Sequence, residues 1–302
     1  MDYIDSRRAE VEHALAATLP PVPECPQVVH DAMSYSLHAG GKRLRPILCL
    51  ASADAVGGDR TMALPAACAI ELIHTYSLIH DDLPAMDNDT MRRGRPTLHV
   101  VAGEGIAILA GDGLLTQAFA HLSSEPRSTD PAVIARKLEV VQIIAAAAGP
   151  IGMVGGQAID LATVTPNADG RLPLPLDEQG VRIMHSKKTG ALLRASGRCG
   201  AVMGGGSDEQ IVAIDDASGE FGLAFQIVDD ILDVEGVSAD LGKTTGKDAA
   251  SGKPTYPSMY GVEASRRMAR ECLERAESRL AAARVADPRL LSIGRWIVER
   301  SN

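Results

Sequence analysis

Two clusters of aspartate residues, each following an apolar run with the pattern of a helix, constrain this chain more than any other feature. The first consists of Asp81, Asp82 and Asp87, and the second of Asp229, Asp230 and Asp233. Six carboxylates that share a small volume repel one another unless cations lie between them. The fold must therefore either bring the two helix ends together around bound cations or keep both clusters in solvent.

The second cluster has the spacing of a binding face. Asp229 and Asp233 are four residues apart, so they lie on one side of a helix, and Gln226 lies one turn earlier on the same side. The two clusters offer only oxygen ligands and no cysteine, which suits Mg²⁺, particularly when substrate phosphates complete its coordination shell. This pattern predicts chemistry on diphosphates.

The first cluster has a different local geometry. Asp81 and Asp87 are six residues apart and would lie on different faces of a regular helix. Pro84 lies between them, cannot donate the helical hydrogen bond and crowds the preceding turn. We therefore expect the backbone to leave the helix at Pro84 and to bring Asp87 back towards Asp81. A single Asp-rich helix end is often a solvated cap, but two clusters that both interrupt apolar helices favour a functional site.

The sequence also contains basic segments beside Gly and Pro, whose positive charge could balance the aspartate clusters. Arginine binds phosphate oxygens through two parallel hydrogen bonds and lysine binds them as a point charge. Each basic pair alone is typical of solvated surface, and it is their recurrence in a chain with both acidic clusters that indicates anion binding. The segments are Gly40–Pro46, Arg92–Pro96, Lys187–Gly190, Gly242-Lys243 and Lys253-Pro254.

The pattern predicts an all-α fold with one domain over residues 1–302, in which about ten or more helices surround a central cavity. Period-2 runs flanked by hairpin turns are missing from the sequence, and residues 165–179 have the composition of a loop. The expected helices cover residues 6–19, 27–38, 44–56, 64–80, 100–122, 132–148, 181–203, 209–232 and 262–283.

Composition excludes several classes of function. The net charge is −9 and no basic stretch is long enough for a nucleic-acid tail, so we expect no nucleic-acid partner. Five scattered cysteines without a CxxC pair fit reduced thiols. The N-terminus lacks the apolar region of a signal peptide, and apolar stretches such as residues 143–148 are too short to span a bilayer. We expect a soluble, cytoplasmic protein without membrane insertion.

With these motifs assembled, the sequence resembles the trans-isoprenyl diphosphate synthases (polyprenyl synthetases), and among them the bacterial farnesyl diphosphate synthases. The resemblance extends from about Ser34 to Tyr260, with a further match at the C-terminal helix. The matching segments are residues 40–46, 76–87, 92–96, 188–190, 225–233 and 242–243. The resemblance implies the isoprenoid-synthase fold and a homodimer formed through helix packing.

The resemblance also implies roles for individual residues. The six clustered aspartates would bind three Mg²⁺ ions that bridge an allylic diphosphate. The cations that would contact this diphosphate are Arg92, Lys188 and Lys243, with Lys253 as a further substrate-binding residue. The residues that would hold isopentenyl diphosphate are Lys42, Arg45, His74 and Arg93. Thr189 and Gln226, with Lys188, would place dipoles near the allylic cation.

The implied reaction is a head-to-tail condensation of isopentenyl diphosphate with dimethylallyl or geranyl diphosphate, through ionisation, condensation and elimination. No dedicated base is evident, so the departing diphosphate is the expected proton acceptor. Tyr76 lies five residues before Asp81, about 7.5 Å deeper at 1.5 Å per residue. With its neighbour Ser77, it resembles the farnesyl-producing pattern, and a ring at that depth would close the cavity after a C15 product. Tyr76 could equally be ordinary core packing.

Three alternatives stay open at this point. A geranylgeranyl diphosphate synthase would differ only in product length. A class I terpene cyclase would be expected to replace the second aspartate cluster and to lack an isopentenyl site, and both are present in this chain. A non-catalytic regulatory subunit of a prenyl synthase would be expected to lose aspartate ligands, whereas none of the six is missing here.

Overall fold

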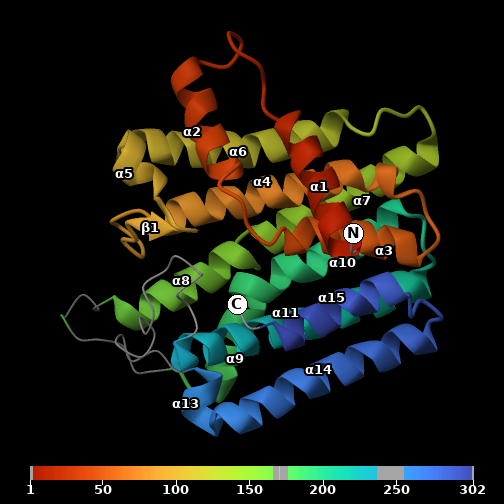
Figure 1. Cartoon of the computed structure of the whole chain (residues 1–302). Coiled ribbons are helices and arrows are strands. Elements are labelled where there is room, and N and C mark those ends of the chain that lie inside the picture. Colours follow the sequence, from red (N-terminus) through yellow and green to blue (C-terminus); the bar gives the residue numbers. More distant parts are fainter. Residues whose placement is uncertain (1–2, 166–169, 171–175, 237–254, 301–302) are drawn as a thin grey trace.

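The computed structural model describes residues 3–165, 170, 176–236 and 255–300, and this part of the chain is almost entirely helical (Figure 1). In chain order, the helices are α1 (Tyr3–Ala16), α2 (Gln27–Leu37), α3 (Leu44–Ala55), η1 (Arg60–Met62), α4 (Leu64–Asp81), α5 (Leu98–Ala102), α6 (Glu104–Ser124), α7 (Pro131–Ala148), α8 (Met153–Val164), α9 (Glu178–His185), η2 (Ser186–Gly190), α10 (Ala191–Met203), α11 (Asp208–Glu235), α13 (Tyr256–Tyr260), α14 (Val262–Ala282) and α15 (Pro288–Glu299). The predicted all-α fold is confirmed.

The helices pack around two hydrophobic cores that share α3 and α10. The first core is built mainly from α2, α4, α6 and α7, and the second from α11, α14 and α15. Figure 1 shows α4 and α6 side by side in the upper half of the molecule, with α11 and α14 below and α10 between them. Gly200 allows α10 to pack directly on α3, because a Cβ atom there would lie 1.9 Å from the carbonyl oxygen of Cys49.

Most of the expected helices are present, and the differences have local causes. Gly103, at φ 83°, ends α5 and divides the helix expected over residues 100–122. The helix α8 was not predicted because Gly155 and Gly156 lower its intrinsic propensity. Its glycines serve packing, since a Cβ atom on Gly156 would lie 2.2 Å from the backbone nitrogen of Lys188.

A two-stranded hairpin follows the first aspartate cluster, which the sequence did not predict. The strands β1 (Met91–Arg92) and β2 (Arg95–Pro96) pair antiparallel. The two residues between them, Arg93 and Gly94, both have positive φ angles, of 53° and 72°. This is the conformation of a tight hairpin turn, which the short sequence RRGRP hides because it has no apolar alternation.

The expectation that no apolar stretch is long enough to span a bilayer was wrong. By length and composition alone, three helical stretches of the described chain qualify: Arg60–Asp81, Glu104–Ser124 and Pro131–Thr163. In the first, 67% of the most apolar window is buried inside the protein, against 33% in each of the others. Core packing therefore accounts for the apolar character of α4, whereas α6 and α7 leave apolar side chains at the surface.

Candidate active site

The backbone turns sharply after α4 and folds the first aspartate cluster back on itself. The helix ends at Asp81, and Pro84 lies exposed in the turn that follows. The backbone N–H of Asp87 donates to the carbonyl oxygen of Asp81 at 2.9 Å, and that of Met86 donates to Leu83 at 2.9 Å. Asp87 therefore returns to Asp81, as the position of Pro84 predicts.

The carboxylate of Asp81 lies in a strongly charged environment. Burial raises its pKa to about 6, and the negative charges of Asp87 and Asp82 act in the same direction. The cations of Lys188 and Arg92 oppose this rise. Because burial disfavours the charged carboxylate, a bound cation would stabilise the ionised form of Asp81.

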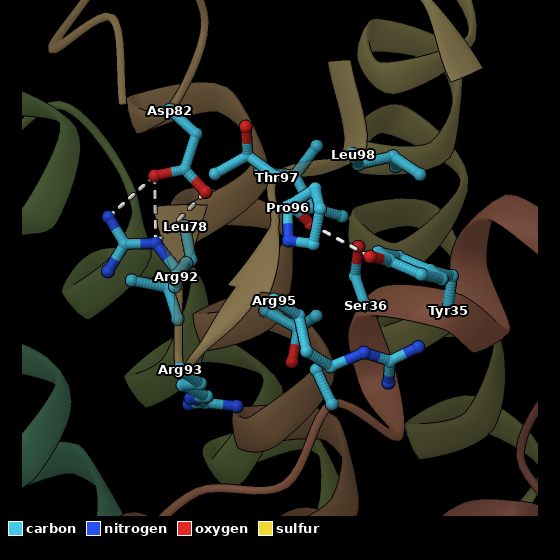
Figure 2. Close-up of a pocket in the computed structure, with 13 residues that line it drawn as sticks. Tyr35, Ser36, Leu78, Asp82, Arg92, Arg93, Arg95, Pro96, Thr97 and Leu98 are labelled. Carbon is cyan, nitrogen blue, oxygen red and sulfur yellow. Dashed lines mark hydrogen bonds and ion pairs between the residues drawn. The ribbon is translucent and has the colours of Figure 1, made fainter. Parts of the chain in front are cut away.

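Asp82 already has a protein partner. Its side chain is 5% exposed, and Arg92 Nε donates to its two oxygens at 2.8 and 2.9 Å while Nη2 lies 2.6 Å from Oδ1. This pair lines a cavity of about 40 Å³. Figure 2 shows that Arg93, which also lines the cavity, is directed away from Asp82. The hairpin that carries both arginines is held to α2, where Tyr35 donates to the carbonyl oxygen of Pro96 at 2.9 Å.

The second cluster lies near the C-terminal end of α11. Asp230 is 3% exposed and accepts hydrogen bonds from Gln226 Nε2 at 2.8 Å and from the backbone N–H of Tyr256 at 3.0 Å. Asp229 and Asp233 are half-buried. Asp229 accepts a hydrogen bond from Arg300 Nη2 at 2.6 Å. In both clusters, the second aspartate of the Asp-Asp pair is thus held by the protein.

A π-helical turn places Lys188 and Thr189 against both clusters. The turn η2 interrupts the helical run from α9 to α10, and such wide turns are common at functional sites. Lys188 Nζ donates to Asp160 Oδ2 at 2.5 Å, and Thr189 Oγ1 donates to Gln226 Oε1 at 3.3 Å. Although burial lowers the pKa of Lys188, the carboxylates of Asp160, Asp81 and Asp87 together raise it above the ordinary value.

These residues surround a polar cavity of about 120 Å³. Its lining residues are Asp160, Thr163, Leu176, Met184, His185, Lys188, Thr189, Gln226, Asp230 and Thr255. The charge of Lys188 interacts with Asp81 and Asp87 of the first cluster, while Gln226 and Asp230 belong to the second. Lys188 therefore relates the two clusters, because it lines the cavity beside Asp230 and its charge acts on Asp81 and Asp87.

A separate group of cations surrounds His74. Arg45 Nη1 lies 3.3 Å from His74 Nε2. Burial lowers the pKa of His74 well below 6.5, and the positive charges of Arg45 and Arg93 lower it further. His74 is therefore neutral, so Nε2 can accept a hydrogen bond from Arg45. Arg93 Nη1 donates to the carbonyl oxygen of Gly40.

Two other residues of the Gly40–Pro46 segment, Gly41 and Lys42, have different contacts. Gly41 has a φ of 130°, and a Cβ atom there would lie 2.6 Å from the Arg93 guanidinium carbon, so only glycine lets the arginine lie against the loop. Lys42 extends over the ring of Trp296, with Nζ 5.9 Å from the ring centroid. Arg45, His74 and Arg93 are thus brought together from three parts of the chain, whereas Lys42 lies against Trp296.

Arg43, in the same basic segment, has a structural role instead. Its side chain is fully buried and donates to Glu71 Oε1 at 2.6 Å, to Glu12 Oε1 at 2.7 Å and to the carbonyl oxygen of Leu37 at 2.5 Å. These bonds fix Arg43 inside the protein. Arg43 therefore differs from Lys42 and Arg45 of the same segment, because its charge is paired inside the protein with Glu12 and Glu71.

The remaining predicted site residues have different outcomes. Tyr76 is 8% exposed within the first core, and its ring meets that of His80 edge-on at 5.7 Å. Ser77 Oγ donates to the carbonyl oxygen of His74 at 2.8 Å. Lys243 and Lys253 lie outside the described residues, so their predicted roles stay predictions, and most of the 165–179 loop is likewise outside them.

Sequence reasoning missed three residues that contact the site. Asp160 on α8 holds Lys188, Trp296 on α15 faces Lys42, and Arg300 holds Asp229. A signal existed for Asp160, which lies one helical turn after Gln157 on a Gly-rich apolar helix. No local pattern marks Arg300 or Trp296, because only the tertiary fold brings the end of the chain to α11 and α3.

The donor set fits a metal that shares its ligands with a substrate. Among the described residues, no three Asp, Glu, His or Cys side chains lie close enough together to hold a metal ion. Their carboxylates nevertheless form a hard-oxygen donor set, and Asp87 and Asp82 lie near enough to Asp81 for their negative charges to add to the effect of burial on its pKa. An ion bound here would need further oxygen ligands, which a diphosphate can supply.

Comparison with known proteins identifies the family and the fold. Residues 26–286 match the family model of polyprenyl synthetase. The chain is 46% identical to the heterodimeric geranylgeranyl pyrophosphate synthase large subunit 1 of Arabidopsis thaliana, covering 100% of this chain and 80% of that protein. It is 42% identical to a geranylgeranyl diphosphate synthase of Cyanophora paradoxa, covering 100% and 97%. The apo structure of an FPP/GFPP synthase from Zymomonas mobilis matches with a TM-score of 0.83 at 38% identity, covering 98% and 97%.

Proposed function

The chain belongs to the polyprenyl synthetase family and is a prenyl diphosphate synthase, and we propose that it joins isopentenyl diphosphate head to tail to dimethylallyl or geranyl diphosphate and releases (2E,6E)-farnesyl diphosphate. The observation that carries this proposal is the pairing of two sites. One is the polar cavity lined by Asp230 and Lys188, where the charge of Lys188 also interacts with Asp81 and Asp87, and the other is the cation group around Arg45 and His74. A condensation needs one site for each diphosphate.

The aspartate clusters would hold Mg²⁺ at the first site. Asp81, Asp87, Asp229 and Asp233 provide the ligands, and three ions per site are expected. Asp82 and Asp230 are buried and hydrogen-bonded within the protein, which suits them to hold the turn and the helix in place. When bound, Mg²⁺ supplies Lewis-acid stabilisation of the charge that develops on the leaving diphosphate.

Lys188 and Arg92 bring cations to the allylic diphosphate. Lys188 is held by Asp160 beside Asp81 and Asp87, so its charge is fixed where the leaving group would lie. A preorganised charge of this kind stabilises the transition state without the cost of reorienting it. Arg92 is bonded to Asp82 and would share its guanidinium between that carboxylate and the substrate.

The second cation group would bind isopentenyl diphosphate. Lys42, Arg45 and Arg93 provide positive charge, and neutral His74 adds a hydrogen-bonding ring without competing charge. Lys243 and Lys253 remain predicted contacts from the part of the chain that is not described. The negative charge of Asp229 acts on Arg45 and opposes the lowering of its pKa by burial. The two diphosphate sites are therefore close enough to interact electrostatically.

The polar groups between the sites suit the carbocation step. Thr189 and Gln226 line the cavity and are hydrogen-bonded to each other, so their oxygen dipoles are held in place. They can stabilise the allylic cation before it meets the double bond of isopentenyl diphosphate. In the final elimination, the C–H electron pair forms the new double bond and the departing diphosphate accepts the proton.

Product length rests on Tyr76. Its ring is buried on α4 below the aspartates and is held edge-on against His80. A ring in this place supports a cavity that ends at fifteen carbons. The second candidate is a C20 product, which the names of the geranylgeranyl diphosphate synthases among the relatives favour.

The surface of α5, α6 and α7 supports a homodimer. Large apolar side chains are exposed along these helices, and two-thirds of the apolar window of α6 is not buried within the chain. The exposed residues include Val100, Val101, Ile108, Leu109, Ile134 and Leu138. A patch of this kind on a soluble protein indicates a partner surface. Sedimentation equilibrium of the purified protein tests this: a dimer is expected, and a monomer at micromolar concentration would contradict it.

The reaction itself is tested by the release of inorganic diphosphate. We expect release only when isopentenyl diphosphate, an allylic diphosphate and Mg²⁺ are all present. Release with the allylic diphosphate alone would indicate cyclisation or hydrolysis and would contradict the proposal. Adding EDTA to the complete mixture should stop the reaction.

A further inference from the structure

Arg300, which directly follows α15, makes several contacts with α11, although its Nη1 is buried without a hydrogen-bond partner among the described residues. Its side chain is 1% exposed. Nη2 donates to the carbonyl oxygen of Phe225 at 2.8 Å, and Nε donates to that of Ile297 at 3.3 Å. The guanidinium carbon also lies 4.0 Å from the centroid of the Phe225 ring. These contacts fix the guanidinium against α11.

The carboxylate that Arg300 holds is much more exposed than the arginine itself. Arg300 Nη2 bonds to Asp229 Oδ1 at 2.6 Å, and the Asp229 side chain is 40% exposed. On the other side, the charge of Asp229 acts on Arg45. One oxygen of Asp229 is therefore held by a rigid, buried donor, while the carboxylate remains accessible from the site.

A simple stabilising ion pair explains this arrangement poorly. Burying a guanidinium carries a desolvation cost that a half-exposed partner repays only in part. An orienting function explains it better. Residues that hydrogen-bond a metal-ligating side chain fix its rotamer and its direction, and their loss typically weakens metal binding about 10- to 100-fold.

We propose that Arg300 is a positioning residue for Asp229, which holds this carboxylate in the orientation that binds Mg²⁺ together with a diphosphate. The inference rests on the proposed function, because it assumes that Asp229 is a metal ligand. It assigns a role to the C-terminal turn of α15, a segment that no sequence motif connects to the site. Arg300 acts through Asp229 and need not touch the substrate.

The experiment measures the Mg²⁺-dependent rise in melting temperature of the protein in the presence of inorganic diphosphate. The variants are Arg300→Gln, which removes the charge, and Arg300→Lys, which keeps it but loses the planar fork. The control is Arg295→Gln on the same helix, because Arg295 is 55% exposed and faces Glu277. The quantity compared is the Mg²⁺ concentration at half of the temperature rise.

We expect this midpoint to move about 10- to 100-fold higher in Arg300→Gln, less in Arg300→Lys, and not at all in Arg295→Gln. A midpoint equal to that of the unmodified protein would overturn the inference, even if the melting temperature without metal fell, because the arginine would then be merely structural. If Arg300→Gln does not fold, Arg300→Lys decides the matter. A failure of Mg²⁺ and diphosphate to stabilise the unmodified protein would instead remove the metal site, and the inference with it.

Discussion

The backbone of Asp87 is hydrogen-bonded to that of Asp81, with the N–H of Asp87 2.9 Å from the carbonyl oxygen of Asp81. Together with the bonds from Met86 and Asn88 to Leu83, it closes the turn around Pro84 and brings two residues that are six apart in sequence to the same end of α4. Because Asp87 is exposed whereas Asp81 is half-buried, the two can approach one cation from different sides.

Asp87→Asn should lower kcat by about 10²- to 10³-fold, because a charge that stabilises the leaving diphosphate through the metal is lost. The side chain is exposed, so the melting temperature without metal should change little. Steady-state kinetics at saturating substrates measures the effect. Asp31→Asn on α2, where the carboxylate is 64% exposed, is the matched control and should retain full activity. Equal rates in the two variants would remove Asp87 from the site.

Tyr76→Ala should lengthen the product, because in the proposed function the buried Tyr76 ring limits the length of the prenyl tail and this change leaves only a methyl group. The dephosphorylated alcohols can be separated by chromatography, and we expect C20 and longer alcohols at the expense of C15. Tyr76→Phe keeps the ring and should keep the product unchanged. An unaltered product distribution in Tyr76→Ala would contradict the proposal that Tyr76 limits the product to fifteen carbons.

Glu71→Gln should destabilise the protein by about 3 kcal/mol or more, because it leaves the buried guanidinium of Arg43 with a weaker partner. The Glu71 side chain is 2% exposed, whereas Glu12, the other partner of Arg43, is 35% exposed. Glu12→Gln should therefore cost only about 1 kcal/mol. Urea unfolding measures both variants, and equal costs would mean that burial does not decide the strength of these pairs.

His74 should be neutral in the folded protein at pH 6.5 and above. Its folded pKa lies well below 6.5, the value expected in the unfolded chain. As pH falls through 6.5 the unfolded state takes up a proton that the folded state does not, so this residue makes folding less favourable at acidic pH. Histidine ¹⁵N NMR can follow the ring directly. A ring that titrates near 6.5 would contradict the neutral, Arg45-bonded state.

The same state predicts how a substitution acts on binding. His74→Gln keeps a neutral hydrogen-bond acceptor, so KM for isopentenyl diphosphate should rise only a few-fold, and the ratio to the unmodified KM should not depend on pH. His74→Phe removes the acceptor and should raise KM further. If the Gln and Phe variants behave alike, the hydrogen bond with Arg45 has no part in binding.

Much of the fold could be predicted because the helices carry their own signals. Apolar runs bounded by Gly and Pro gave α2, α3, α4 and α14 nearly to the residue. The helix α8 was missed because its glycines lower helix propensity, and only its close approach to η2 explains why they are there. A tertiary contact of that kind leaves no periodic pattern.

The candidate site likewise has features that the sequence predicts and features that only the fold shows. The turn at Pro84 and the common face of Asp229 and Asp233 follow from local geometry, so the sequence could predict them. The ion pairs of Lys188 with Asp160 and of Asp229 with Arg300 join residues far apart in the chain. The internal role of Arg43 could not be predicted either, because only the fold shows that its charge is turned towards Glu71.

The central claim is that this chain elongates allylic diphosphates in a Mg²⁺-dependent reaction, and one incubation tests it most directly. The purified protein is mixed with isopentenyl diphosphate and either dimethylallyl or geranyl diphosphate, with and without Mg²⁺, and the dephosphorylated alcohols are separated by chromatography. We predict a C15 alcohol from both primers, only when Mg²⁺ is present. A C20 alcohol would support the reaction but contradict the proposal that Tyr76 limits the product to fifteen carbons. No elongation of either primer would contradict the proposed function.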